Sequence, residues 1–108
     1  MSLLCRAAIC LCAALCACDQ EAPAPAAAAP DARLGRIYVQ TCMACHTSPG
    51  SGAPQAGDRA AWQPRLGQGI DALVRHTIDG YKGMPPLGSC MDCTEAEFEG
   101  LIRFMAGA

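Results

Sequence analysis

Cysteine is the residue type with the greatest capacity for chemistry in this sequence, because the 108-residue chain contains nine of them. Five lie within residues 1–18, Cys42 and Cys45 form one C-x-x-C pair, and Cys90 and Cys93 form another. An odd number of cysteines cannot close completely into disulfides within one chain. At least one cysteine therefore has another task, such as holding a metal or a covalently attached group.

The first C-x-x-C pair is followed directly by a histidine, in the run Cys42-Met43-Ala44-Cys45-His46. C-x-x-C-H is the attachment sequence of c-type haem. Two thiols at this spacing reach the two vinyl groups on one side of the porphyrin, and the adjoining histidine lies under the iron. The sequence thus predicts one covalent haem c, with thioether bonds to Cys42 and Cys45 and with His46 as an axial ligand.

Met84 is the predicted second iron ligand. It lies in a loop with a glycine before it and two prolines after it, and such a loop has no helical face that could bury the side chain. We expect Met43, Met91 and Met105 to pack in the core instead. His46 and Met84 together would leave no iron position for substrate or oxygen. The pattern predicts a one-electron carrier rather than an enzyme, with a reduction potential raised by the thioether ligand.

Helix signals along the chain would position these residues. Asp31 can cap a first helix that ends near Cys42, with apolar residues at helical spacing along it. A second helix is predicted over residues 70–78, with Gly80 placed to end it. A third opens with the capping box Thr94-Glu95-Ala96-Glu97, followed by an apolar stripe. No stretch alternates polar and apolar residues over the length of a strand, so the predicted fold class is all-α.

Residues 1–17 have the composition of a signal peptide. A single charged residue, Arg6, precedes an apolar run of about eleven residues, which suits an export signal and is too short to span a membrane. The run Leu15-Cys16-Ala17-Cys18 resembles the lipobox of bacterial lipoproteins, in which the final cysteine is lipidated. The resemblance implies that Cys18 is a lipid anchor and, because Asp19 follows it, that the protein stays at the inner membrane. Cleavage by an ordinary signal peptidase is the alternative.

Residues 18–30 form a predicted tether rich in proline and alanine. Pro23, Pro25 and Pro30 prevent a helix from running through it, and nothing in it can build a core. The tether would hold a domain of residues 31–108 clear of the membrane surface. We therefore expect a protein of the periplasm of a Gram-negative bacterium.

Charge and size narrow the range of partners. The formal net charge is -2 and the eight basic residues form no patch, so we expect no nucleic-acid partner. A chain of this length has room for one small domain, which excludes a multidomain enzyme. Arg59, Arg65 and Arg75 either surround the haem edge or are solvated on the surface. His76, the other histidine, is expected to be solvated rather than to replace Met84.

Four motifs in order resemble the class I c-type cytochromes, and among them the short bacterial cytochrome c5 group. They are the C-x-x-C-H run, residues 52–62 (Gly-Ala-Pro-Gln-Ala-Gly-Asp-Arg-Ala-Ala-Trp), residues 83–86 (Gly-Met-Pro-Pro) and residues 90–93 (Cys-Met-Asp-Cys). The resemblance covers most of residues 31–108. It implies a small class I cytochrome c fold, in which helices pack around one covalently bound haem.

The resemblance also assigns roles to residues outside the ligand pair. Pro54 would offer its carbonyl to the free ring nitrogen of His46, which fixes the orientation of the imidazole. Trp62 would lie near a haem propionate, and Cys90 and Cys93 would form a small surface disulfide. The implied protein is a monomer that carries electrons between membrane respiratory complexes, with a partner such as a terminal oxidase.

Two other kinds of site stay open from the residues alone. The four cysteines of the two C-x-x-C pairs could bind zinc, although residues 46–89 separate the pairs by far more than the usual zinc-ribbon spacing of about 15–20 residues. Cys90 and Cys93 could instead take part in thiol–disulfide exchange at the N-terminus of the last helix. Mass spectrometry would separate covalent haem, bound zinc and a readily reduced disulfide.

Overall fold

A computed structural model describes residues 30–108. The predicted signal peptide, Cys18 and all of the tether except Pro30 lie outside the described residues. The elements in chain order are α1 (Ala32–Ile37), η1 (Tyr38–Cys42), α2 (Met43–His46), η2 (Pro49–Ser51), α3 (Arg59–Leu66), α4 (Ile70–Asp79), η3 (Pro86–Ser89) and α5 (Glu95–Ala106).

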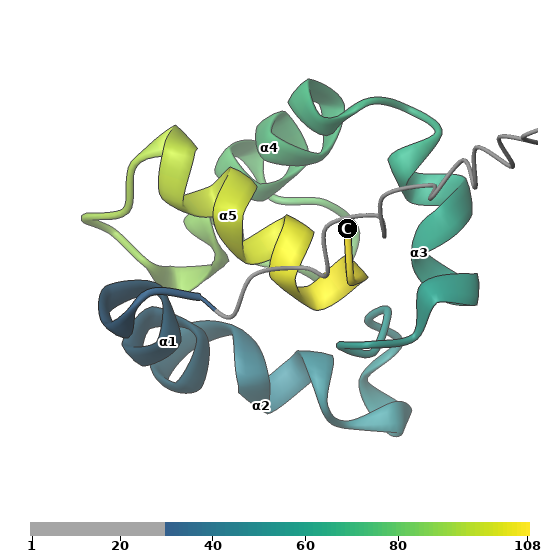
Figure 1. The fold of residues 1–108 in the computed structure, drawn as a ribbon, viewed down its shortest axis with the longest axis horizontal. Helices are drawn as coiled ribbons and strands as arrows, with labels where there is room; N and C mark the ends of the chain where they lie inside the picture. The colour runs from purple at the N-terminus through teal and green to yellow at the C-terminus, as the bar shows by residue number, and fades with distance from the viewer. Residues whose placement is uncertain (1–29) are drawn as a thin grey trace, which may run out of the picture.

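Helices make up all the regular elements of the described chain, which confirms the predicted fold class. In Figure 1, α5 runs through the middle of the molecule, with α4 on one side and α1 on the other. Helix α3 also contacts α5. Within residues 30–108 no helix is both long enough and apolar enough to cross a membrane.

The first predicted helix extends further than the sequence indicated. Asp31 caps it as predicted, since its carboxylate accepts hydrogen bonds from the backbone N–H groups of Arg33 and Leu34 at 2.9 and 2.8 Å. The helix then widens to π geometry in η1, where the N–H of Met43 donates to the carbonyl of Tyr38. It continues as α2 to His46 instead of ending near Cys42. The whole C-x-x-C-H run therefore lies on helical backbone.

The second and third predicted helices are confirmed as α4 and α5. Helix α4 ends at Gly80, whose φ of 84° belongs to the left-handed region that glycine adopts readily. At the start of α5 both halves of the capping box are present: the N–H of Glu97 donates to Oγ1 of Thr94 over 3.3 Å, and the N–H of Thr94 donates to Oε2 of Glu97 over 2.9 Å. Both helices are thus delimited by short-range signals.

Helix α3 was not predicted from the sequence. Asp58 begins it by accepting a hydrogen bond from the N–H of Ala61 at 3.1 Å. Pro64 lies inside the helix, where proline lacks the N–H that would bond to the preceding turn. Because a proline usually marks the end of a helix, Pro64 obscures the helix signal in the sequence. Helix α3 carries Trp62, the only tryptophan of the chain.

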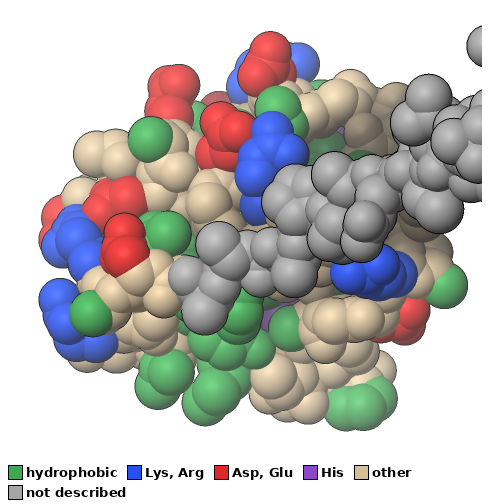
Figure 2. Space-filling model, viewed as in Figure 1, with side chains coloured by type: hydrophobic (Ala, Val, Ile, Leu, Met, Phe, Trp, Pro, Cys, Tyr) green, Lys and Arg blue, Asp and Glu red, His purple; other side chains and the backbone are tan. Residues whose placement is uncertain are grey.

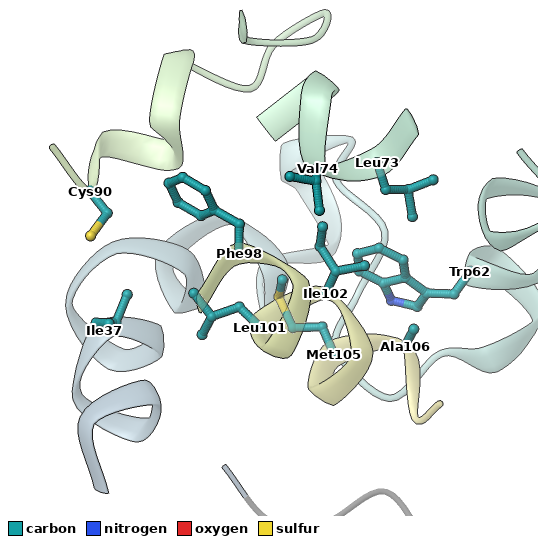
Figure 3. Packing of buried hydrophobic residues seen from close by; sticks show 10 residues of the cluster. All are labelled: Ile37, Trp62, Leu73, Val74, Cys90, Phe98, Leu101, Ile102, Met105 and Ala106. Atoms are coloured by element: carbon teal, nitrogen blue, oxygen red, sulfur yellow. The ribbon is translucent and has the colours of Figure 1, made fainter. Parts of the chain in front are cut away.

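The core forms where α5 meets the other helices (Figure 3). Helix α5 contributes the largest share of buried side chains, and α1, α3, α4 and the segment before α5 supply the rest: Phe98, Leu101, Ile102, Met105, Ala106, Ile37, Trp62, Leu73, Val74 and Cys90. A side chain at Gly100 would bring its Cβ within 2.9 Å of Leu34 Cδ1. The absence of a side chain at this position thus allows α1 and α5 to approach closely.

Core packing was predicted for three methionines, and the structure confirms it for one of them. Met105 is 3% exposed, so its predicted place in the core is confirmed. The predictions for Met43 and Met91 are wrong, because these side chains are 37% and 81% exposed. Met43 lies on an outward face of α2, and Met91 lies between the two cysteines of a short closed loop.

Hydrophobic side chains reach the surface along the lower edge of Figure 2, and acidic and basic side chains are interspersed elsewhere on that face.

Candidate functional site

The C-x-x-C-H run places its three reactive side chains at the end of one helix. Cys42 is the last residue of η1, and Cys45 and His46 are the last residues of α2. Both cysteines carry free thiols, Cys42 half-buried and Cys45 exposed. Residues three apart on a helix share a face, so the two thiols are presented on the same side. Burial raises the pKa of the Cys42 thiol, while a hydrogen bond with Thr41 acts in the opposite direction.

His46 is held by the loop that follows it. Its side chain is buried, and Nδ1 lies 2.8 Å from the carbonyl oxygen of Pro54. A carbonyl can only accept, so Nδ1 carries the proton and the lone pair resides on Nε2. The N–H of Ala56 donates to the backbone carbonyl of His46 over 2.7 Å, which joins loop and helix a second time. The contact between His46 and Pro54 that the resemblance implied is present, and Nε2 has no hydrogen-bond partner among the described residues.

Trp62 supports the same imidazole from α3. The side chain is 4% exposed, and its ring stacks on His46 with centroids 5.9 Å apart and an angle of 21° between the planes. The indole N–H donates to the carbonyl of Gln55 over 2.9 Å. The structure therefore gives Trp62 a place beside the imidazole. Its contact with a propionate remains a prediction.

Sequence reasoning missed Gln55. Its side-chain amide donates to the backbone carbonyls of Ala53 and Ser48 at 2.8 and 3.1 Å. The backbone carbonyl of Gln55 accepts the indole N–H of Trp62. Gln55 thereby connects the end of α2, the loop and α3. No sequence pattern could have identified it, because its side-chain amide donates to backbone carbonyls, which every residue type has, and its contact with Trp62 depends on the fold.

Met84 lies in a small turn that follows α4. The N–H of Tyr81 donates to the carbonyl of Met84 over 3.1 Å, and the N–H of Met84 donates to the carbonyl of Tyr81 over 2.9 Å. The Met84 side chain is half-buried, and a Cβ at Gly88 would lie 3.3 Å from its Cε atom. The segment after the turn, η3, contacts η1. Tertiary packing thus links the Met84 loop to the helix that carries Cys42.

Contrary to the prediction, His76 is not fully solvated. It is half-buried on the last turn of α4, and its ring stacks on Tyr81 with centroids 4.0 Å apart and planes 14° apart. Of the three arginines without a decided role, Arg65 donates to the carbonyl of Ala61, whereas Arg59 and Arg75 are exposed.

Cys90 and Cys93 form a disulfide, with Cα atoms 5.5 Å apart. Two of the four ligands of the zinc alternative are therefore bonded to each other. Cys90 is buried and Cys93 half-buried, which limits the access that thiol–disulfide exchange requires. The structure thus favours a structural disulfide over both alternative sites.

An ion pair joins α1 to the start of α5. The Arg33 guanidinium contacts the Glu97 carboxylate, and it also lies 3.9 Å from the carboxylate of Asp92 in the disulfide loop. Hydrogen bonds from Arg33 and from the backbone of Thr94 lower the pKa of Glu97 from its ordinary value to about 2. The ionised Glu97 thus connects the first and last helices.

The donor set fits a c-type haem. Two free thiols three residues apart, next to a buried imidazole with an unpaired Nε2, are the groups by which such a haem is attached. A soft thioether, that of Met84, lies in a later loop. A zinc site would leave the thioether unused and would lack the second thiol pair.

Known proteins with this arrangement are c-type cytochromes. A family model described as cytochrome C oxidase, cbb3-type, subunit III matches residues 29–105. A cytochrome c-555 of Chlorobaculum tepidum is 41% identical over 82 residues, which are 71% of this chain and 76% of the relative. A solved mono-heme ferrocytochrome c from Shewanella putrefaciens is 40% identical with a TM-score of 0.63, and the match covers 69% of this chain and 93% of that one. The chain belongs to the monohaem class I c-type cytochromes.

Two further relatives agree with this assignment. A cytochrome c5 of Ectopseudomonas mendocina is 40% identical to the present cytochrome over 73 residues, which are 66% of this chain and 84% of the relative. A structure described as an electron transfer complex of nitrite reductase with cytochrome c contains a chain that is 35% identical with a TM-score of 0.63, covering 72% of this chain and 95% of that one. The cytochrome carries one covalent haem c and is an electron carrier, not an enzyme.

Proposed function

We propose that this cytochrome is a high-potential one-electron carrier whose haem iron is bound by His46 and Met84. The observation that carries the proposal is the contact between His46 Nδ1 and the Pro54 carbonyl, because it leaves Nε2 as the metal-binding nitrogen. The haem supplies an iron that alternates between the ferrous and ferric states. Cys42 and Cys45 hold the cofactor by thioether bonds.

The residues around His46 favour a fixed ligand geometry. The backbone carbonyl of Pro54 sets the ring orientation, and the stacked indole of Trp62 keeps water from one face of the imidazole. A hydrogen bond to Nδ1 would make the imidazole of His46 more basic, and a thioether ligand from Met84 would favour ferrous iron. The imidazole orientation is therefore set by residues of this chain itself.

Carbon monoxide binding tests whether both axial positions are filled. The ferrous wild-type protein should not bind the gas, whereas Met84→Ala should bind it because one iron position opens. Met91→Ala is the matched control, since Met91 is a second methionine whose side chain is 81% exposed. Binding by the wild type, or no binding by Met84→Ala, would refute the pair of ligands.

Partner proteins are proposed from the relatives. A chain similar to this one occurs in an electron transfer complex with a nitrite reductase, and the matching family model is described as an oxidase subunit. We propose that a reductase or a terminal oxidase of the respiratory chain accepts the electron. Stopped-flow mixing of the ferrous cytochrome with each purified enzyme should show oxidation that saturates with enzyme concentration for the true partner. No oxidation of the cytochrome by either enzyme would exclude this assignment.

The N-terminal sequence motivates a proposal about location. Cys18 would carry a lipid that anchors the protein to the periplasmic face of the inner membrane, and residues 18–30 would tether the haem domain to it. Replacing Cys18 with alanine should move the cytochrome from the membrane fraction to the soluble periplasm. Full retention of that variant on the membrane would contradict the anchor.

A further inference from the structure

The turn that carries Met84 is poorly supported by its own residues. Tyr81, Lys82 and Gly83 are all exposed, and the reciprocal hydrogen bonds between Tyr81 and Met84 close the turn without attaching it to a helix. Lys82 has a φ of 53°, which is an unfavourable conformation for a residue with a side chain. Exposed turns open more readily than core segments, and contacts with neighbouring elements oppose that opening.

The stack of Tyr81 on His76 provides that external contact. The two rings are nearly parallel, 14° apart, with centroids 4.0 Å apart. The Lys82 ammonium group lies 5.3 Å from the Tyr81 ring centroid, within the range of a cation–π interaction. The Tyr81 ring is thus fixed to a side chain of α4, although it is 44% exposed.

His76 lies on a helix, α4, that is packed against the core. The neighbouring side chains of Val74 and Thr77 are buried, and the Thr77 hydroxyl donates to the carbonyl of Leu73 over 3.0 Å. Helix α4 packs along α5 and against η3, the segment that follows the Met84 turn. A ring fixed to His76 is therefore fixed relative to the core.

We propose that His76 and Tyr81 are a positioning pair, which holds the Met84 turn against α4 and keeps the thioether in place as an iron ligand. The inference rests on the proposed ligation by Met84. Neither ring touches the iron in this account. Their effect passes through the two backbone hydrogen bonds that connect Tyr81 to Met84.

Competition with free imidazole measures how firmly Met84 is held. Imidazole binds ferric iron only when Met84 leaves, so its affinity rises as the turn loosens. The strength of an aromatic stack corresponds to a change of about two- to tenfold. His76→Ala and Tyr81→Ala should each raise the imidazole affinity by this factor, and the double variant should raise it no further than the larger single effect.

Conservative and control variants separate positioning from general loss of stability. His76→Phe and Tyr81→Phe keep two stacked rings and should retain wild-type affinity. Asp71→Asn, an exposed change at the opposite end of α4, should have no effect. Amide hydrogen exchange gives a second readout: His76→Ala should accelerate exchange at Tyr81 and Met84 while leaving Ile102 in the core of α5 protected.

Several results would overturn the proposal. These are unchanged imidazole affinity in both alanine variants, effects that multiply in the double variant, and failure of the phenylalanine variants to restore the wild-type value. The wild-type optical spectrum separates this failure from failure of the ligand assignment. A ferric wild-type spectrum without a sulfur-to-iron band would mean that Met84 is not the ligand. A present band with unchanged affinity in the variants would refute only the role of His76 and Tyr81.

Discussion

The indole of Trp62 stacks on the imidazole of His46, with 5.9 Å between the ring centroids, while the indole N–H donates to the backbone carbonyl of Gln55. One side chain of α3 thereby supports the proposed iron ligand and closes the loop that orients it. This relationship makes the stability of the loop depend on a hydrogen-bond donor at position 62.

Trp62→Phe should destabilise the protein by about 1–3 kcal/mol, because it removes the hydrogen-bond partner of the part-buried Gln55 carbonyl and leaves a smaller ring in place of the buried indole. Denaturant unfolding of the haem-loaded protein measures the effect. Gln63→Ala, an exposed change on the same helix, should alter the free energy of unfolding by less than about 0.5 kcal/mol. Equal stabilities of Trp62→Phe and wild type would contradict the supporting role.

Gly80→Ala should destabilise the loop that carries Met84 by about 1–3 kcal/mol. The residue has a φ of 84°, and a Cβ there would lie 3.1 Å from the nitrogen and Cδ of Pro86 and 3.2 Å from the Met84 carbonyl oxygen. Backbone and ring atoms of this kind cannot rotate away. Thermal unfolding provides the measurement.

Gly83→Ala is the matched control for the change at Gly80. It lies in the same turn, but a Cβ at this position meets no atom within 4 Å and its φ is not in the left-handed region. Its melting temperature should stay near that of the wild type. If both glycine variants unfold alike, the close approach at Gly80 is not what stabilises the loop.

Glu97→Gln should flatten the acid side of the stability profile. Contact with Arg33 and Thr94 lowers the pKa of Glu97 from 4.5 to about 2, so the ionised side chain favours the folded state. This contribution is complete above pH 4.5 and is lost as the pH falls toward 2. The melting temperature of the wild type should therefore decline through that window more steeply than that of the variant.

Glu95→Gln serves as the control for the pH experiment. Glu95 lies in the same first turn of α5 and is exposed, and it forms no ion pair within residues 30–108. This variant should keep the wild-type pH dependence. A Glu97→Gln profile parallel to that of the wild type would show that the pair with Arg33 does not persist in solution.

Reduction of the disulfide between Cys90 and Cys93 should lower stability by about 2 kcal/mol, the value expected from the chain entropy of a loop of four residues. Unfolding with and without a phosphine reductant measures the loss. The double variant Cys90→Ser, Cys93→Ser should unfold like the reduced protein and should not respond to the reductant. No change on reduction would indicate that the loop is held by other contacts, such as the approach of Arg33 to Asp92.

The parts of the fold that the sequence predicted are those set by short-range signals. Asp31, Gly80 and the capping box at Thr94 each act on neighbouring backbone groups, and all three delimit helices as expected. Helix α3 was missed because Pro64 lies inside it, and a proline is normally a sign that a helix ends. Trp62 of this helix is buried in the core, and that contact depends on tertiary packing.

The site was predictable to the extent that its chemistry depends on spacing. Cys42, Cys45 and His46 are neighbours in sequence, so their proximity needed no fold. The contacts of Gln55 with backbone carbonyls and the stack of His76 on Tyr81 join groups by tertiary structure, and residue types alone do not encode them. The outward direction of Met43 and Met91 is a similar case, since hydrophobic character does not determine which way a side chain points.

The optical spectrum of the ferric protein at neutral pH tests the central claim most directly. Ligation of iron by a thioether gives a weak band that other ligands do not produce. We predict this band in the wild type and in Met91→Ala, and its complete loss in Met84→Ala. A band that persists in Met84→Ala, or that is missing from the wild type, would contradict the assignment of His46 and Met84 as the two iron ligands.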